Sequence, residues 1–414
     1  MISILWGLMG CAILIGITYI LSENKKAISF RTIAIGFILQ VILGFIVFKW
    51  SIGIAFIEVI SNGVDAVMQS GQEGLKFVFG DLADKEGPVG SIFVINVLTI
   101  MVFLTALIAL LYHFKIMQFF VRVVGGFISK FMKTGYVEST NAVTNMFLGM
   151  TQSAISVKPY INHVSRSQVF AIMVGGLASV SGAVLFGLVA LGIPIDYLLS
   201  AAIMSAPAGL MMAKLLIPET DELNDSEWRN VDTFTPTGGE DGEKSTFMDA
   251  IIEGSRDGVS LTVNAAMILI TIIGLVALID TILGGVGSIF GLGDISLKMI
   301  FGYIFSPFAF IIGIPWNEAF MAGGLLGEKI ILNEFVAFTS FSDMIGQFSD
   351  KSAAIMTFAL AGFANVGSIG IILGIMIGIA PKRKHEIQGL AFKSLMVATF
   401  ANLLNGAIVG MFFF

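Results

Sequence analysis

Charged residues are scarce in this sequence. Asp, Glu, Lys and Arg make up only 13% of its 414 residues, and 56% are hydrophobic, whereas soluble domains contain about 25% charged residues. The mean hydropathy is +0.92, and apolar stretches long enough to cross about 30 Å of hydrocarbon recur along the chain. The composition excludes an ordinary soluble protein and indicates an all-α polytopic membrane protein, with lipid as its surroundings.

Cysteine is nearly absent, and the common catalytic and nucleotide-binding motifs are missing. The one cysteine, Cys11, excludes an intrachain disulfide. We find no His/Cys metal spacing, Walker loop or nucleophile elbow, so we expect no cofactor and no enzyme, and ATP-driven transport by this chain alone is disfavoured. The basic residues cluster at membrane boundaries, which argues against a nucleic-acid partner.

Eight segments are long and apolar enough to span a membrane. The first lacks the positive flank and cleavage site of a signal peptide, so we interpret it as a retained helix. The predicted spans lie near 3–21, 32–49, 92–112, 168–190, 196–217, 258–286, 354–380 and 388–413.

Three further segments are too polar for plain spans. The basic, amphipathic stretch 114–133 suits a helix lying in the membrane interface; a short helix on the soluble side is the alternative. Segments 138–164 and 298–340 are mildly apolar and broken in the middle. We predict that both are re-entrant hairpins, because non-helical backbone is tolerated at membrane depth only inside protein or beside water.

Basic clusters set the predicted orientation. Lys25, Lys26 and Arg31 follow the first span, and Lys382–Lys384 separate the last two. If both hairpins return to their own side, these clusters and the 114–133 helix share one face, which the positive-inside rule makes cytoplasmic. We therefore predict that both termini lie outside; the short termini suit a bacterial inner-membrane protein.

Two stretches look like copies of each other. Gly175–Gly182 and Ala361–Ser368 place small and polar residues inside apolar runs, and each follows another interrupted run, at Gly149–Ser153 and at Ile314–Glu318. Paired, interrupted hydrophobic segments in two halves of a chain mark the binding sites of secondary transporters. Because the predicted hairpins enter from opposite faces, we expect inverted repeats.

These repeats predict the division of the chain. Residues 218–249 are its one long polar segment and are rich in acid, so we expect a flexible cytoplasmic linker there; an ion- or partner-binding loop is the alternative. The predicted units are scaffold helices with the interfacial helix (1–137), a first hairpin repeat of a transport domain (138–217), a scaffold helix (250–297) and a second hairpin repeat (298–414).

Glu318 is the most notable candidate for a binding site. A lipid-facing carboxylate at this depth costs about 2.5–3.5 kcal/mol on insertion scales, so we expect it to face a polar cavity, although a purely structural acid is the alternative. Asn365 and Ser368 lie three residues apart and share a helix face. They predict either ligand contacts at an opened helix or hydrogen bonds between helices.

The first half of the chain contains candidate ligands for a cation. Asn145, Thr151, Gln152 and Ser153 lie in the first hairpin, and Ser179 begins the polar part of the first repeat. Amide and hydroxyl oxygens, with carbonyls freed by a broken helix, match a hard cation such as Na⁺.

These motifs resemble the concentrative nucleoside transporter family. The resemblance covers nearly the whole chain and depends on Gly176–Ser179, on Ile314–Ala319, and on Gly362–Asn365 followed by Ser368. It implies a homotrimer in which each protomer has a scaffold and a mobile transport domain that moves like an elevator.

The resemblance also assigns residues. It implies that Glu318, Asn365 and Ser368 bind the ribose of a nucleoside. It places the first hairpin tip and several apolar side chains beside the base and sugar: Met150, Thr151, Gln152, Val184, Leu261 and Phe363. It implies that Na⁺ takes side-chain oxygens from Asn145 and Ser179 and backbone carbonyls from Leu148 and Val180.

The first hairpin tip departs from the family pattern. The usual Gly-Gln-Thr-Glu-Ala-Pro is replaced by Gly149–Ala154, with Met150 at the base-contacting amide and Gln152 at the tip carboxylate. Met150 cannot make the hydrogen bonds of an amide, whereas Gln152 both donates and accepts. We infer a changed base preference that leans towards purine nucleosides. The lost carboxylate favours Na⁺ over H⁺ as the coupling ion.

We therefore predict a cation-coupled nucleoside importer. A carrier of another small polar metabolite, such as a free nucleobase, is the nearest alternative, and binding of the ribose distinguishes the two. An intramembrane enzyme would need a nucleophile–base pair or metal cluster, which the sequence does not show. A channel would conduct without saturating.

Overall fold

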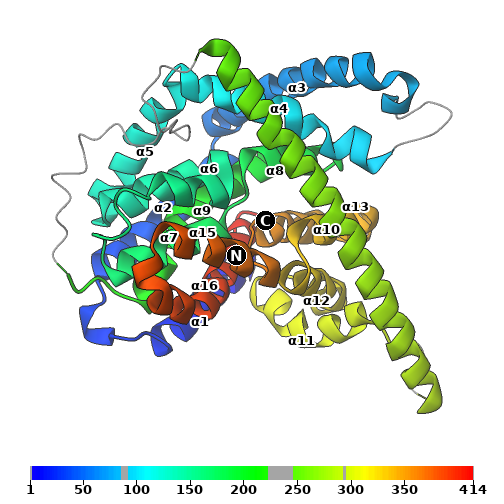
Figure 1. The fold of residues 1–414 in the computed structure, drawn as a ribbon. Coiled ribbons are helices and arrows are strands. Elements are labelled where there is room, and N and C mark those ends of the chain that lie inside the picture. The colour runs from blue at the N-terminus through cyan, green and yellow to red at the C-terminus, as the bar shows by residue number, and fades with distance from the viewer. Residues whose placement is uncertain (1, 85–91, 222–245, 292–294, 414) are drawn as a thin grey trace.

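The computed structural model describes residues 2–84, 92–221, 246–291 and 295–413. These residues fold into helices, with no strand among them (Figure 1). The first half contains α1 (Ile2–Ile20), α2 (Phe30–Phe48), α3 (Ser51–Phe79), a π-helical turn (Val94–Leu98), α4 (Ile100–His113), α5 (Ile116–Met132), α6 (Tyr136–Ser156), α7 (Arg166–Ala178), α8 (Gly182–Ala190) and α9 (Ile195–Leu216). The second contains α10 (Phe247–Ile289), α11 (Leu297–Ile311), α12 (Trp316–Ile331), α13 (Glu334–Met344), α14 (Asp350–Leu360), α15 (Val366–Ile379) and α16 (Lys384–Gly410).

All eight predicted spans fall on helices, and the 114–133 segment forms α5. No predicted span covers α3, which with its following turn is also long and apolar enough to cross a membrane. Glu58, Asp65 and Glu73 interrupt its hydrophobic run, so the sequence contains no continuous apolar stretch there. Most of the predicted acidic linker, residues 222–245, lies outside the described residues.

The predicted second hairpin was placed wrongly. Segment 298–340 contains three helices instead of two, and the 117° bend at Ile312–Pro315 joins α11 to α12. Pro315 is the N-cap of α12, a position where a backbone N–H donor is not needed and its fixed φ is tolerated. The turn comparable to the first hairpin tip lies one helix later, at Leu332–Asn333, between α12 and α13.

The corrected assignment gives a twofold order of elements. A long helix (α4), an amphipathic helix (α5), a hairpin (α6, bent at Gly149), a broken helix (α7 and α8) and a final helix (α9) occur first. Then α10, α11, the α12–α13 hairpin, the broken α14–α15 and α16 follow in the same sequence. The inverted orientation and the re-entry of the hairpins stay predictions.

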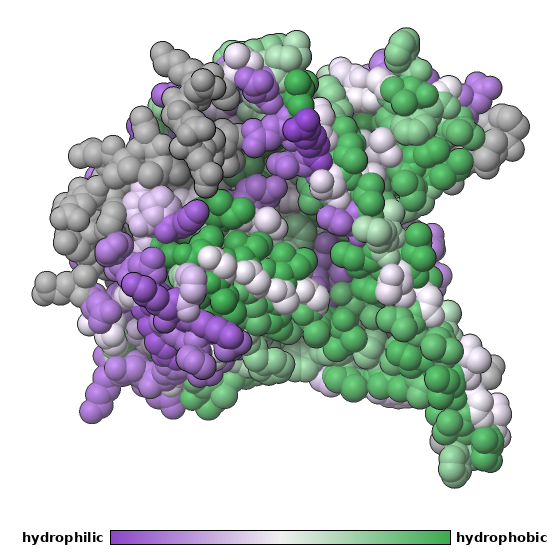
Figure 2. Space-filling model, in the orientation of Figure 1, coloured by the Kyte–Doolittle hydropathy of each residue, from purple (hydrophilic) through white to green (hydrophobic). Residues whose placement is uncertain are grey.

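Two sets of helices pack closely. A Cβ at Gly254 of α10 would lie 2.7 Å from Ala106 Cα of α4, so small residues let these two backbones touch. A Cβ at Gly7 of α1 would similarly meet Met411, which brings the two termini together beside α16 (Figure 1). Most of α10 is exposed: only 6% of its apolar stretch is buried, and its projecting end presents a hydrophobic surface (Figure 2).

The loop after α1 is tied to both repeats. Glu23 pairs with Arg166 at the start of α7, and its Oε1 accepts from Lys393 Nζ of α16 at 2.7 Å. These two basic groups lower the pKa of Glu23 to about 2. The first two helices are thus linked to α7 and α16 by charge as well as by packing.

Candidate functional site

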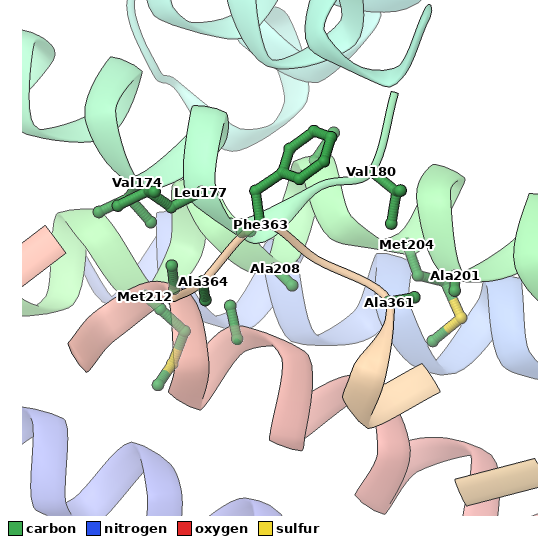
Figure 3. Packing of buried hydrophobic residues seen from close by; sticks show 14 of the residues in the cluster. Val174, Leu177, Val180, Ala201, Met204, Ala208, Met212, Ala361, Phe363 and Ala364 are labelled. Atoms are coloured by element: carbon green, nitrogen blue, oxygen red, sulfur yellow. The ribbon is translucent and has the colours of Figure 1, made fainter. Parts of the chain in front are cut away.

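The two broken helices meet at their breaks, where Phe363 and Ala364 lie close to Leu177 (Figure 3). The Phe363 N–H, in the break between α14 and α15, donates to the Ser179 carbonyl in the break between α7 and α8, at 3.2 Å. Asn402 of α16 bridges both breaks, since its Nδ2 donates to the carbonyls of Ala178 (2.6 Å) and Ala361 (3.1 Å). Backbone groups released by helix ends are therefore satisfied across the two halves, as buried polar groups require.

The breaks are related through their N-caps. Ser181 caps α8 by accepting from Val184 N at 3.4 Å, and Asn365 caps α15 by accepting from Ser368 N at 2.7 Å. Ser181 therefore corresponds to Asn365. The sequence comparison, which paired Gly175–Gly182 with Ala361–Ser368, is wrong by two residues.

The acid that meets Asn365 is Glu334. Asn365 Nδ2 donates to Glu334 Oε2 at 3.0 Å, and both residues are buried. Glu334 is the first residue of α13, and Asn333 caps that helix by accepting from Val336 N at 2.8 Å. The second hairpin turn thus delivers a carboxylate to the crossing of the broken helices, next to the buried Ser368.

The expectation that Glu318 shares this site is wrong. Glu318 lies in the first turn of α12, where its carboxylate accepts from Ser349 N and Oγ at 3.4 and 3.2 Å. Ser349 caps the start of α14, and Asn365 follows the other end of that 11-residue helix, about 16 Å away along its axis. One feature of the sequence could have identified Glu334. It is an acid that directly follows Asn333, a typical helix-capping residue, between apolar segments.

The first hairpin tip packs against both breaks. Gly149 interrupts α6 with φ 80° and ψ 175°. A Cβ there would lie 2.7 Å from Ser181 Cβ and 3.8 Å from the Phe363 ring. Met150 is buried beneath the tip, where its Cβ is 3.4 Å from the Cβ position of Gly176. The tip can approach this closely only because glycine tolerates that conformation.

Gly149→Ala should therefore destabilise the protein by about 1–3 kcal/mol, the cost of a non-glycine residue in such a conformation. Thermal unfolding of the purified protein would show this as a lower Tm. The matched control is Gly370→Ala on α15, where nothing lies within 4 Å of the new Cβ; alanine in a helix should leave Tm unchanged or slightly higher. Equal Tm values for the two variants would contradict the assignment.

The outer face of the first hairpin tip lines a cavity of about 780 Å³. Predicted site residues Leu148, Thr151, Gln152 and Leu261 border it. Val184 is buried next to Ala183, which also lines it. The remaining polar lining comes from α4, α5, α10 and the turn between α4 and α5: Thr105, Tyr112, His113, Lys115, Gln118, Glu253 and Asp257.

The second hairpin lines a separate cavity of about 810 Å³. Leu332 and Val336, on either side of Glu334 in sequence, border it together with α10. The first cavity uses α10 residues 250–261 and the second uses 266–280, so their centres lie about 25 Å apart along this helix. Each hairpin tip therefore borders its own chamber, at a different level of α10.

The predicted Na⁺ ligands gather at the α7–α8 break. Asn145 Nδ2 donates to Gly175 O at 2.6 Å, and its Oδ1 accepts from Ser153 Oγ at 3.2 Å. Ser179 Oγ donates to Val180 O at 3.3 Å. These oxygens are neutral and buried, a donor set that suits a hard monovalent cation. Leu148 lies three residues after Asn145 on the same hairpin.

Family models cover most of the chain. A model described as "Na+ dependent nucleoside transporter C-terminus" matches residues 197–410, its N-terminal counterpart matches residues 9–82, and one described as "Nucleoside recognition" matches residues 94–194. The chain belongs to the Na⁺-dependent, concentrative nucleoside transporter family. It is a multi-span membrane transporter and not an enzyme, which confirms the resemblance predicted from the motifs.

Relatives and solved structures agree with this assignment. The chain is 43% identical to the uncharacterized transporter YutK of Bacillus subtilis, over 99% of this chain and 100% of that one. It is 37% identical to the nucleoside permease NupC of Helicobacter pylori, over 99% and 98%. The structure is similar to CNTnw in an inward-facing substrate-bound state, with TM-score 0.93 and 38% identity over 99% of this chain and 98% of that chain.

Proposed function

We propose that this protein is a Na⁺-coupled importer of nucleosides, with a preference for purine nucleosides, in a bacterial inner membrane. The observation that carries the proposal is the buried Glu334–Asn365 pair at the crossing of the broken helices. An ionised carboxylate accepts hydrogen bonds and donates none. It therefore suits a neutral ligand with adjacent hydroxyl groups, as ribose has, and Ser368 adds a hydroxyl on the same face of α15.

The base would lie at the first hairpin tip. Thr151 and Gln152 border the first cavity, while Phe363, Val184 and Leu261 supply apolar surface close to it. Met150 cannot form hydrogen bonds of the kind an amide would make with the base, whereas Gln152 can both donate and accept hydrogen bonds. The base of a purine nucleoside such as inosine or guanosine offers both hydrogen-bond donors and acceptors to Gln152.

Coupling follows from the shared Ser179. An ion held by Asn145 Oδ1, Ser179 Oγ and carbonyls such as those of Leu148 and Val180 would order the α7–α8 break. Because the Phe363 N–H donates to the Ser179 carbonyl, that order extends to the break that holds Asn365. Each ligand should then tighten the other by the same factor.

In the proposed transport motion, the contacts between helices would decide which helices move and which stay fixed. Because α1 packs on α16 and Glu23 pairs with Arg166 and Lys393, α1 and α2 would move with the two repeats, whereas the division predicted from sequence puts them in the scaffold. The closely packed α4 and α10 would be the scaffold, and the exposed apolar face of α10 would meet its copies in a homotrimer. The hairpins would then carry the ligand past α10 in an elevator motion, between chambers at two levels. In the predicted topology both termini face outside.

Thermal stabilisation of the purified protein tests this function. A ligand that binds the folded state raises Tm by mass action, so inosine or guanosine should raise it, and more strongly in Na⁺ than in choline at the same pH. Repeating the Na⁺ and choline series at lower pH would detect H⁺ as an alternative ion. Stabilisation by hypoxanthine equal to that by inosine would replace the nucleoside with a nucleobase, because ribose would then contribute nothing.

A further inference from the structure

Lys329 is a basic side chain deep inside the second repeat. It is 1% exposed, and its Nζ donates to Ala359 O at 3.0 Å and to Asn402 Oδ1 at 2.6 Å. Both acceptors are neutral oxygens. Within the described ranges no carboxylate lies at ion-pair distance from it, although the charge of Glu334 attracts it from further away. A buried cation is costly unless its surroundings are built to hold it.

The position of Lys329 matches that of Asn145 in the first repeat. Asn145 lies four residues before Gly149, where α6 is interrupted, and Lys329 lies four residues before Asn333, the N-cap of α13. Each side chain donates to a carbonyl in the last turn before a helix break. For Asn145 this is Gly175 O of α7, and for Lys329 it is Ala359 O of α14.

The surroundings of the Lys329 amine are those of a cation site. A main-chain carbonyl at a helix end and an amide oxygen are the ligand types that a hard monovalent ion takes. Asn402 also connects this site to the carbonyls of Ala178 and Ala361. The amine therefore supports the last turn of α14, next to the α14–α15 break.

We propose that the Lys329 ammonium is a tethered cation that fills, in the second repeat, the position for which the first repeat takes Na⁺. The inference rests on the proposed Na⁺ site at Asn145. It means that one half of the protein supplies the cationic group from its own chain and the other half awaits an ion. The transporter then binds one Na⁺ with each nucleoside, and only the α7–α8 break responds to the ion concentration.

Lys329→Asn tests the inference by placing the residue of the first repeat in the second. Inosine affinity is measured by thermal shift across a Na⁺ series, with choline keeping the ionic strength constant. The slope of log affinity against log Na⁺ concentration gives the number of ions taken up with the ligand. We expect a slope of one for the native protein and of two for Lys329→Asn, whose affinity should be at least tenfold lower at low Na⁺ and recover at high Na⁺.

Two further variants serve as controls. Lys329→Met cannot hold an ion in the second repeat, so its affinity should be at least tenfold below that of the native protein at every Na⁺ concentration, with a slope that stays at one. Lys214→Asn changes the other lysine that is buried in the described part of the chain, whose partners include two carboxylates, and the slope should stay at one.

The outcomes separate the inference from the proposed function. A native protein with no Na⁺ dependence would contradict the Na⁺ coupling itself. A native slope of one with a slope of one for Lys329→Asn would overturn only the tethered cation. A Lys329→Asn protein that is folded only at high Na⁺ supports the inference, and one that is unfolded at every Na⁺ concentration overturns it, because the vacated site would then not accept the ion.

Discussion

Glu334→Gln should reduce nucleoside uptake by about 100-fold or more. Hydrogen bonds to a charged group are worth about 1.5–3 kcal/mol each, and two of them from a ribose correspond to a factor of about 100 or more. The amide keeps the size of the side chain but replaces one acceptor oxygen with a donor. Uptake of radiolabelled inosine into vesicles with an inward Na⁺ gradient would measure the loss.

Glu318→Gln is the matched control, because it makes the same change in the neighbouring hairpin helix. Glu318 contacts Ser349 at the start of α14, so uptake should stay within about twofold of the native level, since partly exposed polar contacts contribute little. The opposite pattern, with Glu318→Gln inactive and Glu334→Gln near normal, would return the ribose site to the position first predicted. Size-exclusion profiles of both variants would show whether each remains folded.

The apolar part of the fold could be predicted from sequence because its signal is local. Spans such as α1 and α9 are continuous hydrophobic runs of the length that hydrocarbon requires. The helix breaks were also visible, since small and polar residues such as Gly362 and Asn365 interrupt those runs. What composition could not supply was the partner of each break, which lies in the other half of the chain.

The second hairpin shows where this reasoning failed. Pro315 and Glu318 form a conspicuous break, but a proline and an early acid also begin an ordinary helix. The turn that precedes Glu334 lies within five residues of Glu328 and Lys329. A sequence segment with this many charged residues resembles a surface loop. Only the fold shows that Glu334 and Lys329 are buried while Glu318 is partly open.

Lys214→Met should lower the free energy of unfolding by about 3–5 kcal/mol, because removing one partner of a buried ion pair leaves the other charge uncompensated. Lys214 Nζ lies 2.8 Å from Glu138 Oε2 and 2.9 Å from Glu219 Oε2, and it donates to Ser167 Oγ at 3.0 Å. The Glu138 side chain is fully buried. This cluster joins the starts of α6 and α7 to the end of α9, so chemical unfolding in detergent should report its loss directly.

Adding Glu138→Gln to Lys214→Met should restore more than half of the lost stability, because the uncompensated carboxylate is then gone. The restored part measures the cost of the buried charge, and the remainder measures the lost contacts with Ser167 and Glu219. Lys393→Met is the control: its lysine pairs with Glu23 at the surface, where such pairs contribute at most about 1 kcal/mol. If Lys214→Met were no more destabilising than Lys393→Met, Glu138 would have to be neutral in the native protein, and the first hairpin would be anchored by packing alone.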